Sequence, residues 1–167
     1  MKKISQFFLL VSIIIWATIL GAIVYSHMVF FFPYLTHLPA STALLKGDYA
    51  MHDERFWMMI HPALIMSLII TLLLNWKLAA RRKYILIAMG IYAVAIITTF
   101  LYFVPELKSF AASDQSNISA QEWLQRGNKW QYLSWTRGGF MLLGFILLLV
   151  SLTKSEKVIR VADHPGP

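Results

Sequence analysis

The 167-residue chain contains no cysteine and few charged residues. The lack of cysteine excludes a disulfide framework, a thiolate metal site and a CxxC redox centre of the thioredoxin or vitamin K reductase type. Charged residues make up only 14% of the chain, whereas about a quarter of a soluble domain is charged. This scarcity of charge argues against a domain that is surrounded by water.

Hydrophobic residues account for 58% of the sequence. A chain of this size cannot enclose so much apolar surface in one core, because roughly a third of the unfolded-chain surface stays exposed in a domain this small. We therefore predict a single transmembrane domain, residues 1–167, with the lipid bilayer as its first partner. The formal charge of +7 does not indicate nucleic acid, because the basic residues stand at the ends of apolar segments, as topogenic charges do.

Four apolar segments reach the length of about 20 residues that a spanning helix needs. None shows the alternation of a lipid-facing strand, so we predict an all-α, up-down-up-down membrane four-helix bundle. The first segment exceeds the apolar stretch of a signal peptide and is read as an uncleaved helix. The predicted helices are 7–32, 57–76, 84–104 and 132–152, the loops between them on one side are 33–56 and 105–131, and the tail is 153–167.

Basic residues predict the orientation of this bundle. Nine lie on the side of the two termini and six on the side of the two long loops, where six acidic residues also lie. The side richer in lysine and arginine is normally cytoplasmic. We therefore expect both termini in the cytoplasm and the chain in the inner (plasma) membrane, with the two long loops outside.

Short interfacial helices are expected in both outer loops. In the first loop the stretch Ser41–Leu45 is a candidate, with Ser41 as its N-cap. In the second, the stretch 120–130 is amphipathic, and Trp123 and Trp130 are expected at headgroup depth. By contrast, the cytoplasmic half of each helix consists of Leu, Ile, Val and Ala and is expected to be scaffold.

Ionisable residues gather at the outer ends of the helices. His27, His61 and Arg137 each lie about one turn inside a predicted helix, and Glu106 follows Pro105 at the end of another. Each has a plain alternative: a hydrogen-bonded packing histidine, a helix-capping glutamate or an arginine that snorkels to headgroups. Four antiparallel helices bring all four to similar depth, however, and ionisable groups at membrane depth suggest a site. We predict a shared polar pocket.

Helical spacing adds residues to this candidate pocket. Trp130, Ser134 and Arg137 fall at i, i+4 and i+7 and share one face. Glu54 and His61 share a face in the same way if the second helix starts before Trp57, which we also count as a pocket residue.

Two types of chemistry remain open for this pocket. His27, His61 and Glu106 are possible ligands of a metal such as Fe, Zn or Cu, although no HxxxH or HxxE spacing supports them. Without metal or other cofactor, a histidine serves as a general base and Arg137 stabilises an oxyanion.

Three stretches resemble one family of small four-helix membrane proteins, which includes the anthrone oxygenase-like proteins. They are GlyAlaIleValTyrSerHis in the first helix, TyrPheValProGluLeu at the end of the third, and ArgGlyAsnLysTrpGlnTyrLeuSerTrpThrArgGly entering the fourth. The strongest part is the pattern of Asn128, Trp130 and Arg137. The resemblance covers residues 17–152 and implies a four-helix bundle and cofactor-independent oxygenation of an anthrone, with His27, His61 and Arg137 as base and anion-stabilising charge. The stretch 52–62 departs from the polyketide branch.

The sequence thus supports three functional hypotheses. The first is a membrane oxidoreductase that acts on a lipophilic aromatic or quinone-like molecule. The second is a non-catalytic membrane subunit or a binder of lipid or small molecules. The third is a metal- or haem-binding membrane protein. The sequence does not predict an oligomeric state.

Overall fold

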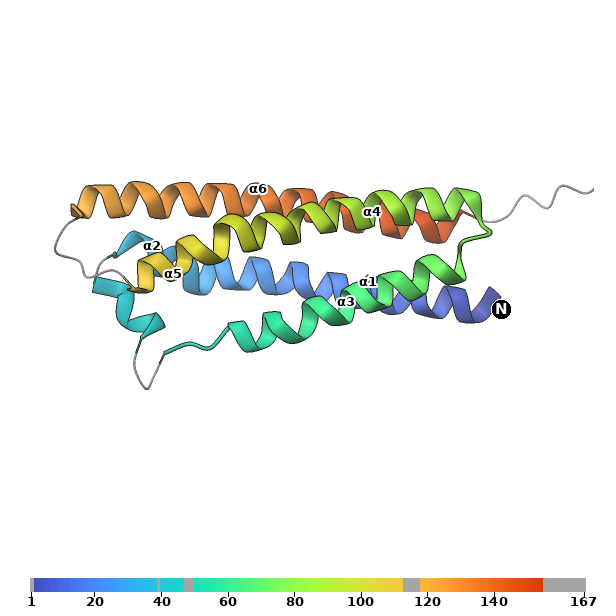
Figure 1. The fold of residues 1–167 in the computed structure, drawn as a ribbon, viewed down its shortest axis with the longest axis horizontal. Helices are drawn as coiled ribbons and strands as arrows, with labels where there is room; N and C mark the ends of the chain where they lie inside the picture. Colours follow the sequence, from blue (N-terminus) through green and yellow to red (C-terminus); the bar gives the residue numbers. More distant parts are fainter. Residues whose placement is uncertain (1, 39, 47–49, 113–117, 155–167) are drawn as a thin grey trace, which may run out of the picture.

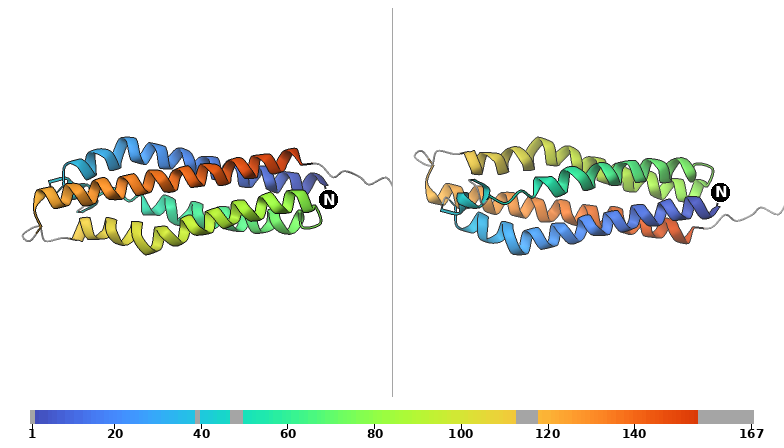
Figure 2. Two further views of the ribbon diagram at one scale, coloured as in Figure 1. Left: turned by 90° about the horizontal axis from the view of Figure 1, so that it is seen from above. Right: turned by 90° about the horizontal axis from the view of Figure 1, so that it is seen from below.

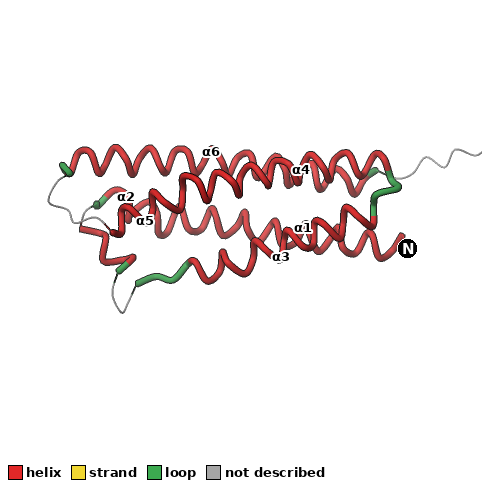
Figure 3. Tube along the Cα trace, in the orientation of Figure 1, coloured by secondary structure: helices red, strands yellow, loops and turns green. Residues whose placement is uncertain are grey.

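The computed structural model describes residues 2–38, 40–46, 50–112 and 118–154, and all regular structure in these ranges is helical (Figure 3). Four helical stretches are long and apolar enough to cross a membrane: Lys3–Thr36, Glu54–Leu74, Ala79–Ala112 and Ala120–Thr153. The prediction of an all-helical protein with four apolar helices is confirmed. Most of the predicted tail, residues 155–167, lies outside the described residues.

Short π-helical and 3-10 segments interrupt or connect the long helices. The elements in chain order are α1 (Lys2–Tyr25), the π-helix η1 (Ser26–Phe31), α2 (Phe32–Thr36), the 3-10 helix η2 (Ala40–Leu45), α3 (Glu54–Leu74), α4 (Ala79–Thr98), the π-helix η3 (Thr99–Phe103), α5 (Val104–Ala112) and α6 (Ala120–Thr153). The expected short helix at Ser41–Leu45 is present as η2. Ser41 lies inside it rather than at its cap and donates to the carbonyl of Tyr34.

The long helices lie side by side along one axis (Figure 1). Helix α1 packs against α3 and α6, and α4 packs against α6 and α3. The start of α1 and the end of α6 lie at the same end of the bundle in every view (Figure 2). We call this the terminal end, and we call the opposite end, which carries residues 37–38, 40–46, 50–53 and 118–119, the loop end.

Three of the four stretches are longer than predicted. Lys3–Thr36, Ala79–Ala112 and Ala120–Thr153 each contain 34 residues and are thus about 51 Å long at 1.5 Å per residue. The hydrocarbon core of a bilayer is only about 30 Å thick, which matches the 21 residues of α3. The three long stretches therefore extend past α3 at the loop end (Figure 1).

The predicted interfacial helix at 120–130 is in fact the first part of α6. The side chain of Ser119 accepts a hydrogen bond from the backbone N–H of Glu122 and caps the helix there, which is the usual role of serine at a helix start. Trp123 and Trp130 are buried in the protein rather than exposed on a separate surface helix, and their depth in a bilayer stays a prediction. Their spacing along one helical face directs them toward α2 and α5 rather than outward.

The buried hydrophobic residues form two separate cores. The larger one joins α1, α3, α4 and α6 and is mostly aliphatic. The second lies at the loop end, where the three long stretches extend past α3, and we call this part of the bundle the extension. It is mostly aromatic, and its buried members are Phe30, Phe31, Tyr34, Leu35, Leu38, Phe103, Phe110, Trp123 and Trp130. We call these the aliphatic core and the aromatic core.

The terminal half of the bundle is not purely apolar, contrary to expectation. The buried hydroxyl of Ser12 lies 2.7 Å from that of Ser67 and 2.9 Å from that of Thr71, which links α1 to α3. Asn75, fully buried, donates to the carbonyl of Thr71. A hydroxyl that also bonds to its own helix backbone, as Ser12 does to the carbonyl of Phe8, is easily accommodated in an apolar segment. Such residues therefore do not stand out in the sequence.

Candidate functional site

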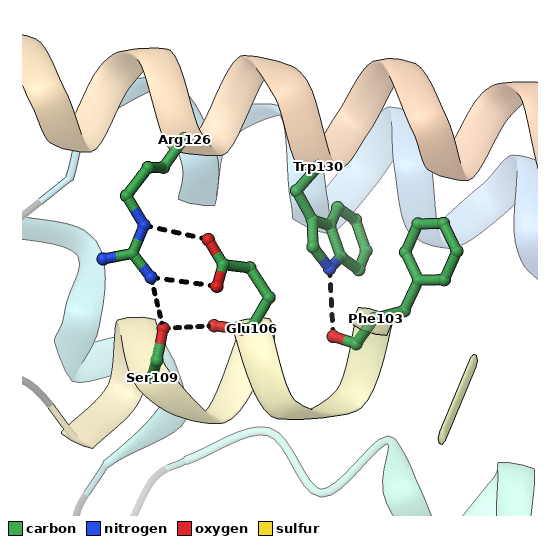
Figure 4. Close-up of polar contacts among 5 residues, drawn as sticks. All are labelled: Phe103, Glu106, Ser109, Arg126 and Trp130. Atoms are coloured by element: carbon green, nitrogen blue, oxygen red, sulfur yellow. Dashed lines mark hydrogen bonds and ion pairs between the residues drawn. The ribbon is translucent and has the colours of Figure 1, made fainter. Parts of the chain in front are cut away.

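The junction between the two cores is built from two π-helical segments. Each ends just before a proline: η1 precedes Pro33 and η3 precedes Pro105. Proline lacks an N–H and its ring crowds the preceding turn, so a regular α-helix cannot continue through it without adjustment. Segments of this kind are frequent at functional sites. The side chain of Trp130 connects the two. Its Nε1–H donates to the carbonyl of Phe103 at 3.0 Å (Figure 4), and its ring packs on Phe31.

His27 is buried within η1, with 2% of its surface exposed. Its Nδ1 lies 2.9 Å from the carbonyl of Ile23. A carbonyl only accepts hydrogen bonds, so Nδ1 carries the proton and Nε2 of the neutral ring carries a lone pair. The ring stacks on Trp130 and contacts Trp135, but Nε2 is buried without a hydrogen-bond partner. Since buried polar atoms are normally paired, this nitrogen is a candidate for ligand contact.

Arg137 lies about two turns further along α6 from Trp130. Its NH1 donates to the hydroxyl of Thr99 at 2.5 Å, and its NH2 donates to the hydroxyl of Ser134 at 3.2 Å. The guanidinium lies 4.0 Å above the centre of the Phe103 ring. Its Nε is buried and has no partner. Arginine is always charged, so a cation with a free donor lies at the junction.

His61 contributes a second imidazole from α3. Its Nδ1 lies 2.6 Å from the hydroxyl of Tyr92 on α4. The indole of Trp57, one turn earlier, stacks on the ring at 5.5 Å and 20°. The Trp57 Nε1–H in turn donates to the carboxylate of Asp53 at 3.0 Å. His61 is therefore fixed by partners on both sides.

The structure brings most of the predicted site residues together. Two aromatic rings link Arg137 to His27: the guanidinium lies over Phe103, Phe103 packs edge-on against Trp130 at 5.7 Å, and Trp130 stacks on the imidazole. Ser134 is buried and holds the guanidinium, and Trp130 is stacked on His27. The predicted shared face of Trp130, Ser134 and Arg137 is thus present.

Three predicted residues lie elsewhere. Glu106 forms a two-pronged ion pair with Arg126, with both N···O distances 2.9 Å, and joins α5 to α6 in the extension (Figure 4). Glu54 is exposed and bonded to His52 at 2.8 Å. Asn128 is exposed on α6. On α3, the side chain that lies beside His61 is that of Trp57, which stacks on the imidazole. Glu54, in the first turn of α3, is exposed instead.

Sequence reasoning missed four residues of the site. Thr99, Phe103 and Trp135 contact Arg137 or His27, and Tyr92 binds His61. Threonine, tyrosine and aromatic residues are common in membrane helices, so composition did not single them out. The prolines at 33 and 105 were the usable signal, since each marks an irregular turn just before it.

No group of three His, Asp or Glu side chains suited to a metal occurs among the described residues. The candidate ligands His27, His61 and Glu106 are not assembled, because Glu106 is engaged by Arg126. The remaining pair of imidazoles has a cation beside it, which disfavours a second positive ion.

The fold and the site together define the class of this chain. It is a small integral membrane protein whose four apolar helices carry an Arg and two His near the junction of two cores. No family model, curated protein or solved structure matches the chain.

Proposed function

We propose that this protein binds a lipophilic aromatic or quinone-like molecule at the junction and oxidises it with molecular oxygen. The observation that carries the proposal is the pair of buried nitrogens without partners, His27 Nε2 and Arg137 Nε, in one part of the bundle. The aromatic rings of Phe103, Trp130 and Trp135 around them suit a flat, apolar ligand. The resemblance to anthrone oxygenase-like proteins supports the same class of substrate.

The roles of the residues follow from their bonding. His27 Nε2 takes a proton from the activated CH2 of an anthrone-type ring, because the Nδ1 proton is already donated to Ile23. The negative charge moves to the ring oxygen, where Arg137 stabilises it. The resulting enolate reduces O2, and the net reaction converts CH2 and O2 into C=O and H2O. His61 forms a wall of the site, since its Nδ1 is engaged by Tyr92.

The orientation that we propose has both termini in the cytoplasm of a cell bounded by an inner (plasma) membrane. Its support is the excess of basic residues on the terminal side, nine against six. The site then lies toward the outer leaflet, below the extension.

Oxygen uptake tests the catalytic role of His27. The full chain in lipid nanodiscs is given a hydroxylated anthrone, and O2 consumption is recorded against empty discs. The matched control for His27→Gln is His37→Gln, because His37 makes the same bond to the carbonyl four residues earlier, at 2.9 Å from Pro33, but is exposed. Loss of a general base lowers the rate by about a hundredfold or more, and only in the His27 variant.

Two outcomes would contradict the oxygenase role. Equal rates in the His27 and His37 variants would remove His27 from the mechanism. Binding of the anthrone that depends on His27, without uptake above empty discs, would favour the alternative of a non-catalytic small-molecule binder.

A further inference from the structure

Among the residues that the structure describes, Arg137 has only neutral hydrogen-bond partners. Both of its terminal nitrogens donate to neutral hydroxyls, and within the described residues no carboxylate pairs with it. Arg126, eleven residues earlier on the same helix, provides the contrast: both Glu106 oxygens bind it at 2.9 Å. Within the described part of the chain, the arginine in the extension thus has a carboxylate partner and the one at the junction has none.

The surroundings of Arg137 at the junction favour the binding of an anion. The side chain of Arg137 is half-buried, and a guanidinium removed from water in this way is normally paired with a carboxylate or another acceptor of negative charge. The Phe103 ring, 4.0 Å away, gives only the partial attraction of a cation–π contact. The Nε–H points at no acceptor, so a donor remains for a charged oxygen.

His27 supplies the complementary step. Its Nε2 lone pair accepts the proton of an acidic O–H, and the resulting imidazolium keeps this proton and donates a hydrogen bond through it to the oxyanion. The O–H bond breaks, the N–H bond forms, and the oxyanion lies between two cations. A ligand that enters from lipid as a neutral acid avoids the cost of carrying a charge through the hydrocarbon.

We infer that the ligand of this site is a lipophilic weak acid, an enol or phenol on an aromatic ring, which is bound as its oxyanion between Arg137 and His27. The inference rests on the proposed function and specifies its substrate class. It requires an ionisable oxygen, whereas binding of an apolar ring alone does not.

Two probes that differ in one ionisable proton test it. The acid is 2-hydroxy-1,4-naphthoquinone, and the neutral analogue is its methyl ether, 2-methoxy-1,4-naphthoquinone. Affinities are measured by equilibrium dialysis of protein-loaded nanodiscs against empty discs of the same lipid. The variants are Arg137→Gln, Arg137→Lys, which keeps the charge, and Lys129→Gln, which removes a charge from an exposed position on the same helix.

The wild-type chain is expected to bind the acid at least about tenfold more tightly than the ether. Arg137→Gln weakens binding of the acid by about ten- to a hundredfold, as expected for a hydrogen bond to a charged group, and weakens binding of the ether by no more than about threefold. Arg137→Lys restores part of the preference, and Lys129→Gln leaves both affinities unchanged.

Other results would overturn the inference in distinguishable ways. Equal binding of acid and ether, with both affinities lowered by Arg137→Gln and His27→Gln, would refute the oxyanion while leaving the proposed function standing. Unchanged affinity for the acid in Arg137→Gln would remove Arg137 as counter-ion. Absence of binding of both probes and of anthrone to the wild-type chain would overturn the proposed function as well.

Discussion

Replacing Gly127 by alanine tests whether the start of α6 packs against α2. Gly127 is buried in the extension, and a Cβ there would lie 2.9 Å from the carbonyl oxygen and 3.3 Å from the Cβ of Leu35. The nearer contact is with backbone, which cannot rotate away as a side chain does. Either α2 or α6 must move by several tenths of an ångström.

The magnitude follows from two opposing terms. Overpacking of this kind costs about 1–3 kcal/mol, while alanine gains up to about 1 kcal/mol over glycine from helix propensity. Gly139→Ala isolates the second term, because a Cβ at Gly139 on the same helix meets nothing within 4 Å. The free energy of unfolding of Gly127→Ala is therefore expected to fall below that of Gly139→Ala by about 1–3 kcal/mol.

Unfolding by SDS in mixed detergent micelles, followed by tryptophan fluorescence, measures this difference. Trp123 and Trp130 flank Gly127 in the aromatic core and report on its packing. If Gly127→Ala is as stable as Gly139→Ala, the extension does not pack as described, and residues 120–130 lie free of α2 as the sequence alone suggested.

Three further changes are predicted with the same unfolding assay. Glu106→Gln weakens the two-pronged pair with Arg126 and lowers the free energy of unfolding by about 1–2 kcal/mol. Wild-type stability in this variant would show that the pair does not stabilise the contact between α5 and α6. Trp130→Phe keeps an aromatic ring at this position but removes the N–H that donates to the carbonyl of Phe103, which lowers the free energy of unfolding by about 1–3 kcal/mol. An unchanged unfolding midpoint would contradict this hydrogen bond. Burial raises the pKa of the Asp53 carboxyl. The folded state then holds its proton more tightly than the unfolded state, so stability falls as pH rises above the ordinary aspartate pKa of about 3.9. Asp53→Asn is expected to stabilise the protein at pH 7 and not at pH 3, and a benefit of equal size at both would refute the assignment.

The sequence predicted the helices of this protein better than it predicted their ends. Long apolar runs indicate membrane helices because the bilayer requires them, and all four were found. The extension could not be predicted in this way, since hydropathy indicates a loop at 105–112 and a separate interfacial helix at 120–130. Packing of Phe110 and Trp123 in the aromatic core stabilises them as helix, and such tertiary contacts are not visible in hydropathy.

The candidate site was predictable in part for the same reason. His27, His61 and Arg137 stand out as ionisable residues at membrane depth. Glu106 has the same signal but a different role, because its partner Arg126 lies 20 residues away in a stretch expected to be a separate surface helix. The partners of the site, Thr99 and Tyr92, depend on how the helices face one another and needed the structure.

The unequal helix lengths explain why the site lies where it does. Near the loop end, α1 and α4 change into π-helical segments before their prolines, and the aliphatic core gives way to the aromatic core. His27 lies on one segment, and Thr99, the partner of Arg137, on the other. The two unpaired nitrogens, His27 Nε2 and Arg137 Nε, therefore belong to side chains that lie on or contact these irregular turns. The ion pair of Glu106 and Arg126 joins α5 to α6 beyond both segments, so loosening it should disturb the site through Phe103 and Trp130, which contact Arg137 and His27.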